Sequence, residues 1–295
     1  MKSGTGPGRA DHPRLYNHFA PRTTLSMNIA PHIAESGAWL VPEWPAPPNV
    51  GAVFSSRIGG VSTAPFDSLN LGDHVGDDAA AVAVNRQRFA AATRVEPVFM
   101  RQPHGTHSAD LDLWAPGEQP SADACTTATA GRGCTVMVAD CLPLLFCDAR
   151  GRAVGAAHAG WRGLAAGVIE SCVGALRARL GDPAAPVLAW LGPCIGQAAF
   201  EVGDEVQRAF VQHEAASSAC FEAGAAPGKW QADLAGLARR RLALAGVADV
   251  FGNDGSTPWC TVSNDSRFFS HRRDAGRLGS TGRMAASIWL AGPGS

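Results

Sequence analysis

The stretch CTVMVADCLPLLFCDARGRAVGAAHAGWRG, residues 134–163, decides the fold. It holds three apolar runs, Cys134–Val138, Leu142–Cys147 and Arg152–Ala157, each bounded by polar or turn-forming residues. Short apolar runs with such boundaries are typical of buried β-strands. The joins between the runs are too short to hold a crossover helix, which favours a mixed sheet over a purely parallel one.

Outward from this stretch, predicted strands and helices alternate along the chain. Further strands are predicted over Ala38–Val41, Val50–Ser55, Pro97–Arg101, Val187–Leu191 and Ala285–Leu290. Helices are predicted from the cap Asp77-Asp78 to Thr93, over Leu164–Leu180 with Gly181 as its end, over Asp204–Gln212 and over Leu234–Leu244. The pattern predicts an α/β (α+β) layered sandwich, with a central mixed β-sheet flanked by helices in a single domain over residues 38–295.

The N-terminal segment, residues 1–37, is polar, basic and rich in glycine and proline. It has no apolar h-region, so it does not read as a secretory signal, and we predict a flexible extension. Met27 is an alternative to Met1 as the start of the protein. No run of the chain approaches about 18 apolar residues, which argues against a membrane span.

The composition excludes several classes of protein. Hydrophobic residues make up 46% and charged residues 17% of the chain, too much core material for a disordered protein. Lys and Arg number 25 against 26 Asp and Glu, so the chain lacks the basic footprint of a nucleic-acid partner. The eight cysteines include no CxxC pair, and without a secretory signal we expect reduced thiols in a cytoplasmic protein.

Three residues with metal-binding side chains, His104, Cys141 and His158, lie where a predicted strand gives way to a turn. Two imidazoles and one thiolate would give zinc three ligands and leave a fourth position open, as in catalytic zinc sites. Two alternatives use the same residues. Cys141 is then a metal-free nucleophile activated by a histidine, or an ordinary buried thiol near hydrogen-bonded histidines.

Nine segments match the motifs of one family, in the family's order. They are FSSRIGGVS (Phe54–Ser62), SLNLGDHVGDD (Ser68–Asp78), RQPHGTH (Arg101–His107), VADCLPLLFCD (Val138–Asp148), GAAHAGWRG (Gly155–Gly163), WLGPCIG (Trp190–Gly196), FEVGDEV (Phe200–Val206), SRFFSHRRD (Ser266–Asp274) and GRMAASIWL (Gly282–Leu290). The sequence thereby resembles the YfiH family, also called the laccase-domain or multicopper polyphenol oxidoreductase family. The resemblance covers about residues 50–290, and the HAGWRG and ADCLP motifs are its most specific part.

The resemblance implies a fold, a metal and an activity. The fold would be a single α/β sandwich around a mixed sheet, and the zinc ligands and catalytic residues would be His104, Cys141 and His158. The activity would be phosphorolysis of adenosine, inosine and methylthioadenosine to a free base and a sugar 1-phosphate, with adenosine deamination alongside. The partners would therefore be a small-molecule nucleoside and phosphate.

The laccase name itself fits the composition poorly. Multicopper oxidases hold their copper ions with many histidines in HxH pairs. The nine histidines here are scattered and form no HxH pair, which argues against multicopper chemistry, and a copper polyphenol oxidase is kept only as a further alternative function. A single copper ion remains an alternative to zinc, because a site of two nitrogens and one sulfur accepts either metal.

Substrate-binding residues are sought beside the metal-ligand motifs. Arg57 and Arg162 are candidates for binding phosphate, and the alternative for each is a surface ion pair. Asn70 would bind ribose or base, or cap a turn, and Gln102 would bind substrate or finish a strand. The neighbours of the ligands leave two further choices open. Asp140 is a proton carrier or a structural residue, and Trp161 stacks on a base or belongs to the core.

Two other functions use the same residues. One is a zinc or cysteine hydrolase that edits peptidoglycan precursors, as some members of the family are described. The other is a non-catalytic zinc-binding module, whose site a fourth protein ligand such as His107 would close. Cys194 is expected to be a packed small residue rather than a further ligand. The sequence predicts neither the preferred nucleoside nor the oligomeric state.

Overall fold

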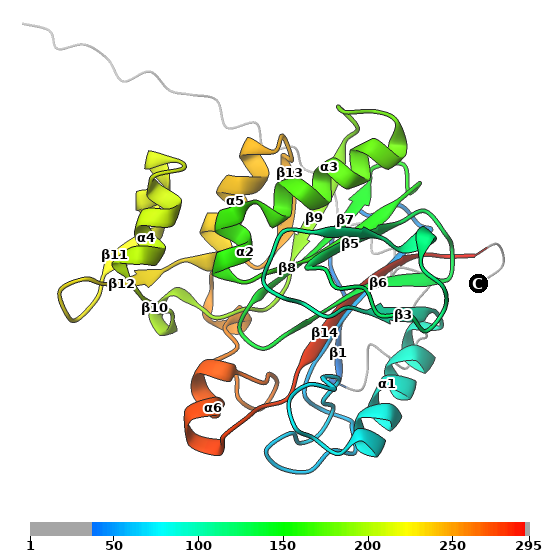
Figure 1. The fold of residues 1–295 in the computed structure, drawn as a ribbon, viewed down its shortest axis with the longest axis horizontal. Helices are drawn as coiled ribbons and strands as arrows, with labels where there is room; N and C mark the ends of the chain where they lie inside the picture. The colour runs from blue at the N-terminus through cyan, green and yellow to red at the C-terminus, as the bar shows by residue number, and fades with distance from the viewer. Residues whose placement is uncertain (1–36, 293–295) are drawn as a thin grey trace, which may run out of the picture.

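Two mixed β-sheets pack face to face in this computed structural model, which describes residues 37–292 (Figure 1). The larger sheet has the strand order β13-β9-β7-β8-β5-β4. Its strands are β4 (Ser108–Asp110), β5 (Ala124–Thr127), β7 (Leu142–Asp148), β8 (Val154–Ala159), β9 (Val187–Leu191) and β13 (Asp249–Gly252). Strands β9, β7, β8 and β5 pair antiparallel, whereas β13 and β4 each pair parallel to their neighbour.

The second sheet has the order β1-β2-β14-β6-β3. Its strands are β1 (Trp39–Leu40), β2 (Val50–Ser55), β3 (Glu96–Phe99), β6 (Arg132–Val138) and β14 (Met284–Leu290). Because β6 belongs to this sheet and β7 to the larger one, the Ala139–Cys141 turn carries the chain from one sheet to the other. Cys141 therefore lies at the edge where the two sheets meet.

A small third sheet lies to one side, with the order β10-β12-β11 (Figure 1). Its strands are β10 (Glu201–Gly203), β11 (Phe221–Ala223) and β12 (Lys229–Ala232), and helix α4 (Asp204–Val211) follows β10 directly. The structure also has short 3-10 turns over Leu111–Leu113, Gln197–Ala199, Ala215–Cys220 and Thr257–Trp259.

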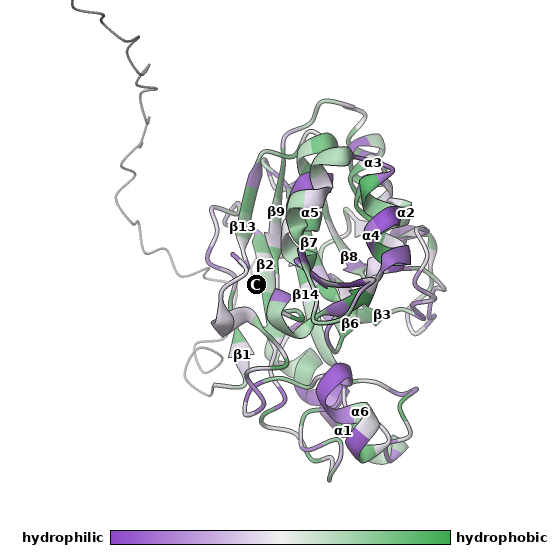
Figure 2. Ribbon diagram, turned by 90° about the vertical axis from the view of Figure 1, so that its left-hand side faces the viewer, coloured by the Kyte–Doolittle hydropathy of each residue, from purple (hydrophilic) through white to green (hydrophobic). Residues whose placement is uncertain are grey.

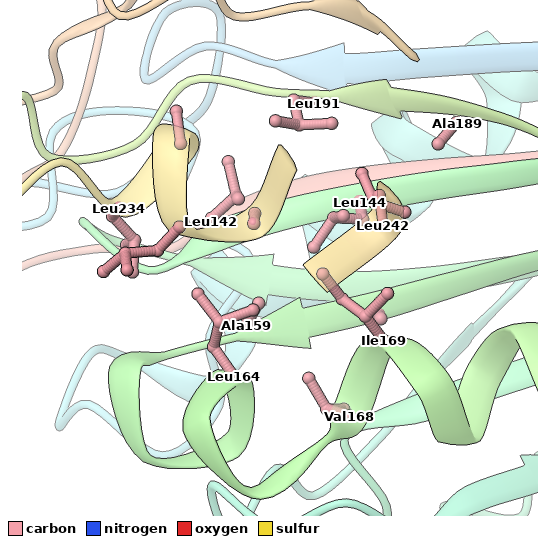
Figure 3. Packing of buried hydrophobic residues seen from close by; sticks show 14 of the residues in the cluster. Leu142, Leu144, Ala159, Leu164, Val168, Ile169, Ala189, Leu191, Leu234 and Leu242 are labelled. Carbon is pink, nitrogen blue, oxygen red and sulfur yellow. The ribbon is translucent and has the colours of Figure 1, made fainter. Parts of the chain in front are cut away.

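Helices cover the outer faces of the two large sheets. Helices α2 (Trp161–Ala166), α3 (Val168–Leu180) and α5 (Leu234–Leu244) pack on the larger sheet, where their aliphatic side chains meet those of β7, β8 and β9 (Figure 3). Helix α1 (Ala79–Thr93) packs on the second sheet through Phe89. Each large aliphatic or aromatic side chain buried in these layers stabilises the fold by about 1.5–3 kcal/mol.

A second apolar layer fills the space between the sheets. It joins Phe54, Val136 and Ile288 of the second sheet to Leu145 and Trp190 of the larger one. Figure 2 shows hydrophobic residues concentrated on the central strands, with hydrophilic ones on outlying helices and loops. The order of layers is therefore helices, sheet, sheet and helix.

The predicted α/β class with mixed sheets is confirmed, and several predicted elements are found within a residue or two. Strands β2 and β9 and helix α5 have the predicted bounds. Helix α1 begins after Asp78, whose side chain accepts a hydrogen bond from the N–H of Ala80.

Two predictions about the fold need correction. Strands expected in one central sheet are divided between two, because a strand buried on both faces has the same pattern whether a helix or a sheet covers it. The single helix expected over Leu164–Leu180 is two helices. Gly167, with φ 105°, breaks it in a conformation that favours glycine.

Helix α6 (His271–Leu278) and strands β4, β5 and β10 to β13 were not predicted as elements. Residues 1–36 of the predicted extension, including Met27, lie outside the described residues. None of the helices in residues 37–292 has the length and apolar character needed to cross a lipid bilayer.

Candidate metal centre and its cavity

His104, Cys141 and His158 converge in space from three separate segments of the chain. His104 lies in the loop after β3, Cys141 in the turn between the two sheets and His158 within β8. Their ligand atoms all lie within 4.8 Å of one another. Cys141 Sγ is 3.9 Å from His104 Nε2, and the two imidazole rings meet edge to face with centroids 4.8 Å apart.

Asp123 holds both histidines in place. Its Oδ1 lies 2.9 Å from His158 Nδ1, and its two carboxylate oxygens accept hydrogen bonds from the backbone N–H groups of His104 and Gly105. A carboxylate on Nδ1 keeps the proton there and leaves Nε2 of His158 as the ligand atom. Asp123 is fully buried, and no motif in the sequence had singled it out.

The three side chains shift one another's protonation. Burial opposes ionisation of the Cys141 thiol, yet the nearby His158 and His104 lower the pKa of this thiol to about 6. Burial disfavours the charged imidazole of His158, yet Cys141 and Asp123 raise its pKa to about 9. In metal-free protein at neutral pH this pair is therefore a thiolate beside an imidazolium. The thiolate is the form of Cys141 that binds a metal ion, and His158 must release the proton on Nε2 when a metal ion binds.

Backbone geometry around the ligands is tight. His104 and Asp140 both have positive φ, 63° and 86°, which is uncommon for residues other than glycine. Gly160 passes so close to the ligands that a Cβ there would lie 2.8 Å from His104 Cδ2 and 3.1 Å from Cys141 Sγ. Glycine at position 160 is thus required by packing against the site.

A cavity of about 810 Å³ opens onto the three ligands. Its lining is mixed: it includes the apolar side chains of Trp161, Ile195, Phe200 and Leu234, the basic residues Arg101, Arg272, Arg283, His74 and His271, and the acidic Asp73 and Asp140. A cavity with such a lining suits a ligand that has both apolar and polar parts.

The ligand set fits a borderline metal ion. Two imidazoles and one thiolate are the donors of catalytic zinc sites, and the described residues bring no fourth His, Cys, Asp or Glu into the group. His107, weighed as a fourth ligand, is exposed and does not belong to the group.

Comparison with known proteins shows the family to which the chain belongs. The family described as multi-copper polyphenol oxidoreductase laccase matches residues 51–291. The purine nucleoside phosphorylase of Pseudomonas aeruginosa is 49% identical over 253 residues, which are 86% of this chain and 98% of the relative. The chain belongs to this laccase-like family.

Other relatives in the laccase-like family extend over nearly the same residues. The purine nucleoside phosphorylase YfiH of Escherichia coli K12 is 48% identical over 253 residues, 85% of this chain and 98% of its own. A solved structure from Neisseria meningitidis has a TM-score of 0.79 at 44% identity and covers 86% of this chain and all of its own. YlmD from Geobacillus stearothermophilus also has a TM-score of 0.79, at 31% identity, covering 86% of this chain and 97% of its own.

Gln102 and Asn70, the two amides predicted to bind substrate, are both held by hydrogen bonds within the protein. Gln102 lines the cavity, but both ends of its amide are hydrogen-bonded to the backbone of Met137, at 2.8 Å each. Asn70 is fully buried and its amide is bound to Gly72, Asp77 and the N–H of Arg283. Neither amide is free to reach a substrate without giving up these bonds.

The two predicted phosphate-binding arginines do not line the cavity. Arg57 faces a separate, smaller pocket, where it is bound to Asp67 and to the carbonyl of Asp265. Arg162 is exposed at the start of α2, and its guanidinium lies 4.5 Å from the ring centre of Trp161. Trp161 itself is half-buried and lines the cavity.

Asp140 lines the cavity, and its carboxylate is already engaged. Oδ1 accepts a hydrogen bond of 2.6 Å from the Thr261 hydroxyl, and Oδ2 accepts one of 2.6 Å from the N–H of Arg272 in α6. These bonds fix the ligand turn to α6. Cys194 is buried and accepts a hydrogen bond from Asn253, as expected of a packed thiol.

The sequence analysis did not single out the cavity residues in α6 and immediately before β14. His271 and Arg272 belong to the SRFFSHRRD motif, and Arg283 belongs to GRMAASIWL. Both motifs had been quoted without a role for these residues. Basic residues within the matched motifs were therefore the signal that could have found them.

Proposed function

We propose that this chain is a zinc-dependent purine nucleoside phosphorylase. Its substrates are adenosine, inosine and methylthioadenosine, which it splits with phosphate into a free base and a sugar 1-phosphate. The observation that carries the proposal is the group of His104, Cys141 and His158 at a cavity lined by both apolar and basic side chains. Relatives that are nearly half identical and named purine nucleoside phosphorylases support it.

His104, Cys141 and His158 would hold the metal, and Asp123 would fix the orientation of His158. When bound, zinc supplies a Lewis acid that stabilises negative charge at the reacting centre. Zinc is proposed over copper because its preferred tetrahedral geometry suits three ligands with one open position.

For phosphorolysis the protein must bind the purine, bind phosphate and exclude water. A phosphate oxygen forms a bond to C1′ of the sugar while the C1′–N9 bond breaks, and the electron pair leaves with the purine, which takes up a proton. Trp161 and Phe200 in the cavity lining suit the flat purine, and the arginines of the lining suit the phosphate.

We extend the proposal to adenosine deamination at the same site. In that reaction water replaces the amino group at C6 and ammonia leaves, so no phosphate is consumed. Deamination therefore gives a phosphate-independent activity against which phosphate-site variants can be measured.

The experiment uses purified protein of known metal content. Adenosine is incubated with and without phosphate, and adenine, ribose 1-phosphate and inosine are quantified. Cys141→Ala is expected to lower both activities by at least about 100-fold, because one of three metal ligands is lost. Cys220→Ala is the matched control, since this buried thiol lies outside the ligand group.

Each outcome decides between the alternatives. Absence of any nucleoside product at every metal loading would contradict the proposal. Amide hydrolysis of a serine-containing peptidoglycan precursor in its place would establish the editing hydrolase. Activity that survives complete chelation would show Cys141 to be a metal-free nucleophile. Copper found as the activating metal would leave the phosphorylase proposal and replace zinc.

The proposed location is the cytoplasm, where nucleosides and phosphate are both present. Eight free cysteines, most of them buried, support a reducing compartment.

A further inference from the structure

We propose that Arg283, which immediately precedes β14, is the phosphate-binding residue of the cavity, and that the Asn70–Gly72 segment positions it. This inference rests on the proposed function and deepens it, since it assigns one of the two substrates to a residue. It also gives the SLNLG motif a role: Asn70, whose amide is already hydrogen-bonded within the protein, would position Arg283 and would not contact the substrate itself.

The guanidinium of Arg283 belongs to the cavity and has free hydrogen-bond donors. Arg283 is half-buried, lines the same cavity as the metal ligands and interacts electrostatically with Cys141 and Asp140. Its Nη1 donates to the carbonyls of Thr281 and Gly282, at 2.9 and 3.2 Å. Among the described residues no acceptor takes a hydrogen bond from Nε or Nη2, so this side of the guanidinium remains available for a ligand.

Asn70 and Gly72 both contact Arg283. Asn70 Oδ1 accepts a 2.8 Å hydrogen bond from the backbone N–H of Arg283, and the Asn70 amide is itself held by Asp77. Gly72 lies against the side chain, since a Cβ at Gly72 would meet Arg283 Cγ at 2.7 Å and Cβ at 3.1 Å. The segment thus has a bond and a close contact that together fix where Arg283 points.

The other candidate arginines are less suited to binding phosphate in this cavity. Arg272 lines the cavity, but its Nη1 and Nη2 are bound to the carbonyls of Ala199 and Glu201. Arg101 lines the cavity but is exposed, so water screens its charge more strongly. Arg57 and Arg162 do not line this cavity. Arg283 alone combines partial burial, proximity to the metal ligands and free donors.

The guanidinium of Arg283 and a phosphate ion are chemically complementary. A guanidinium presents parallel N–H donors that match two phosphate oxygens, and charge-assisted bonds of this kind are stronger than neutral ones. Phosphate held beside Cys141 would lie next to the proposed metal centre. The anion would thus be placed for attack on a nucleoside whose base contacts the apolar side chains of the lining, such as Trp161 and Phe200.

The test is steady-state phosphorolysis of inosine with phosphate varied. Arg283→Gln is expected to raise KM for phosphate about 10- to 100-fold, with a smaller change in KM for inosine. Arg283→Lys should recover part of the loss because it restores a point charge without the fork. Arg150→Gln, an exposed arginine in the turn between β7 and β8, is the control and should leave both constants unchanged.

Gly72→Ala tests the positioning role. It leaves every polar group intact but should displace the Arg283 side chain, so KM for phosphate is expected to rise several-fold while deamination of adenosine is retained. In an Arg283→Gln background the same glycine change should add little to KM, because the two act through one group. Additive effects would overturn the positioning role.

Direct titration separates this inference from the proposed function. Inorganic phosphate is titrated calorimetrically into metal-loaded wild-type, Arg283→Gln and Arg162→Gln proteins. Phosphate binding that needs Arg283, in a protein without phosphorylase activity, would refute the function and keep the site. Unchanged binding or unchanged KM in folded Arg283→Gln protein, loss of binding in Arg162→Gln instead, or no binding to the wild type would overturn the assignment of Arg283.

Discussion

The carboxylate of Asp123 lies 2.9 Å from Nδ1 of His158, and it belongs to a segment far from the HAGWRG motif in sequence. The same carboxylate accepts the backbone N–H of His104, so a single buried acid orients two of the three candidate ligands. Outer carboxylates of this kind set ring orientation and ligand basicity in metal sites.

Asp123→Asn is expected to weaken zinc binding about 10- to 100-fold while the protein still folds. An amide keeps the size of the side chain, but its NH2 group would face donor N–H groups on one side, since both carboxylate oxygens now accept. Competition with a chromophoric chelator measures the dissociation constant. Asp249→Asn, on an exposed strand position, is the control, and equal affinities in the two variants would contradict the role given to Asp123.

Gly160→Ala is expected to disturb the metal centre by contact alone. Its φ of −67° suits alanine, but the added methyl group would press on His104 and Cys141. We expect zinc affinity to fall at least about 10-fold, since ligand positions must shift to relieve the overlap.

Gly174→Ala provides the contrast to Gly160→Ala. It lies on the exposed side of α3 with nothing within 4 Å of the added methyl group, so it should raise the free energy of unfolding by about 0.5–1 kcal/mol and leave zinc affinity unchanged. Zinc titration and denaturant unfolding measure both. Wild-type affinity in Gly160→Ala would show that the ligand geometry tolerates the methyl group.

Thiol reactivity should single out Cys141 in metal-free protein. His158 and His104 lower its pKa to about 6 against the effect of burial, so the thiolate fraction rises through pH 6 and is nearly complete at pH 7.5. Burial raises the pKa of Cys147 to about 12 and raises that of Cys172 as well, so these thiols stay protonated and enclosed.

Iodoacetamide modification followed by peptide mass spectrometry provides the measurement. Labelling at Cys141 should reach half its maximal rate near pH 6, be suppressed by added zinc and be absent in Cys141→Ser. A midpoint near the ordinary thiol value of about 8.5 would contradict the described coupling between Cys141 and the histidines.

The three candidate metal ligands could be selected from the sequence because each is a His or Cys within a recognisable motif, and the structure brings the three together. Asp123 could not be selected, since an aspartate between alanines has no local pattern, and its role depends on the pairing of β5 with β8. Arg57 and Arg162 were chosen for their nearness in sequence to glycine-rich loops. The arginines that line the cavity are Arg101, Arg272 and Arg283, and the last two are more than a hundred residues from Cys141 along the chain.

The fold shows the same division between local and long-range information. Helix α1 and its cap at Asp78 follow from neighbouring residues, and their bounds were found. The division into two sheets depends on which strand lies beside β6 after folding. Its neighbours are β14, from the far end of the chain, and β3, and apolar content does not determine that choice.

The stability of helix α6 bears on the candidate metal centre, because the N–H of Arg272 in this helix donates a hydrogen bond to Asp140. Asp274 is the buried carboxylate within the same helix. Burial opposes ionisation of Asp274, but bonds from Arg273, Ser270 and Thr281 lower its pKa below the ordinary value. A lowered pKa in the folded state means that the carboxylate stabilises the fold above its unfolded pKa of about 3.9. This contribution is lost as the pH falls through the folded pKa.

Asp274→Asn is therefore expected to lower the free energy of unfolding at pH 7 by about 1–3 kcal/mol, since Arg273 keeps its charge but loses its bidentate partner. The difference between variant and wild type should shrink as the pH falls below about 4, where the carboxylate of the unfolded chain begins to take up its proton before that of the folded protein does. Urea unfolding at pH 7, 5 and 3 measures it. Asp265→Asn, exposed and without an ion pair among the described residues, is the control and should stay within about 0.5 kcal/mol of wild type throughout. A difference for Asp274→Asn that is equally large at pH 3 and pH 7 would mean that side-chain shape, rather than charge, fixes α6 beside the cavity.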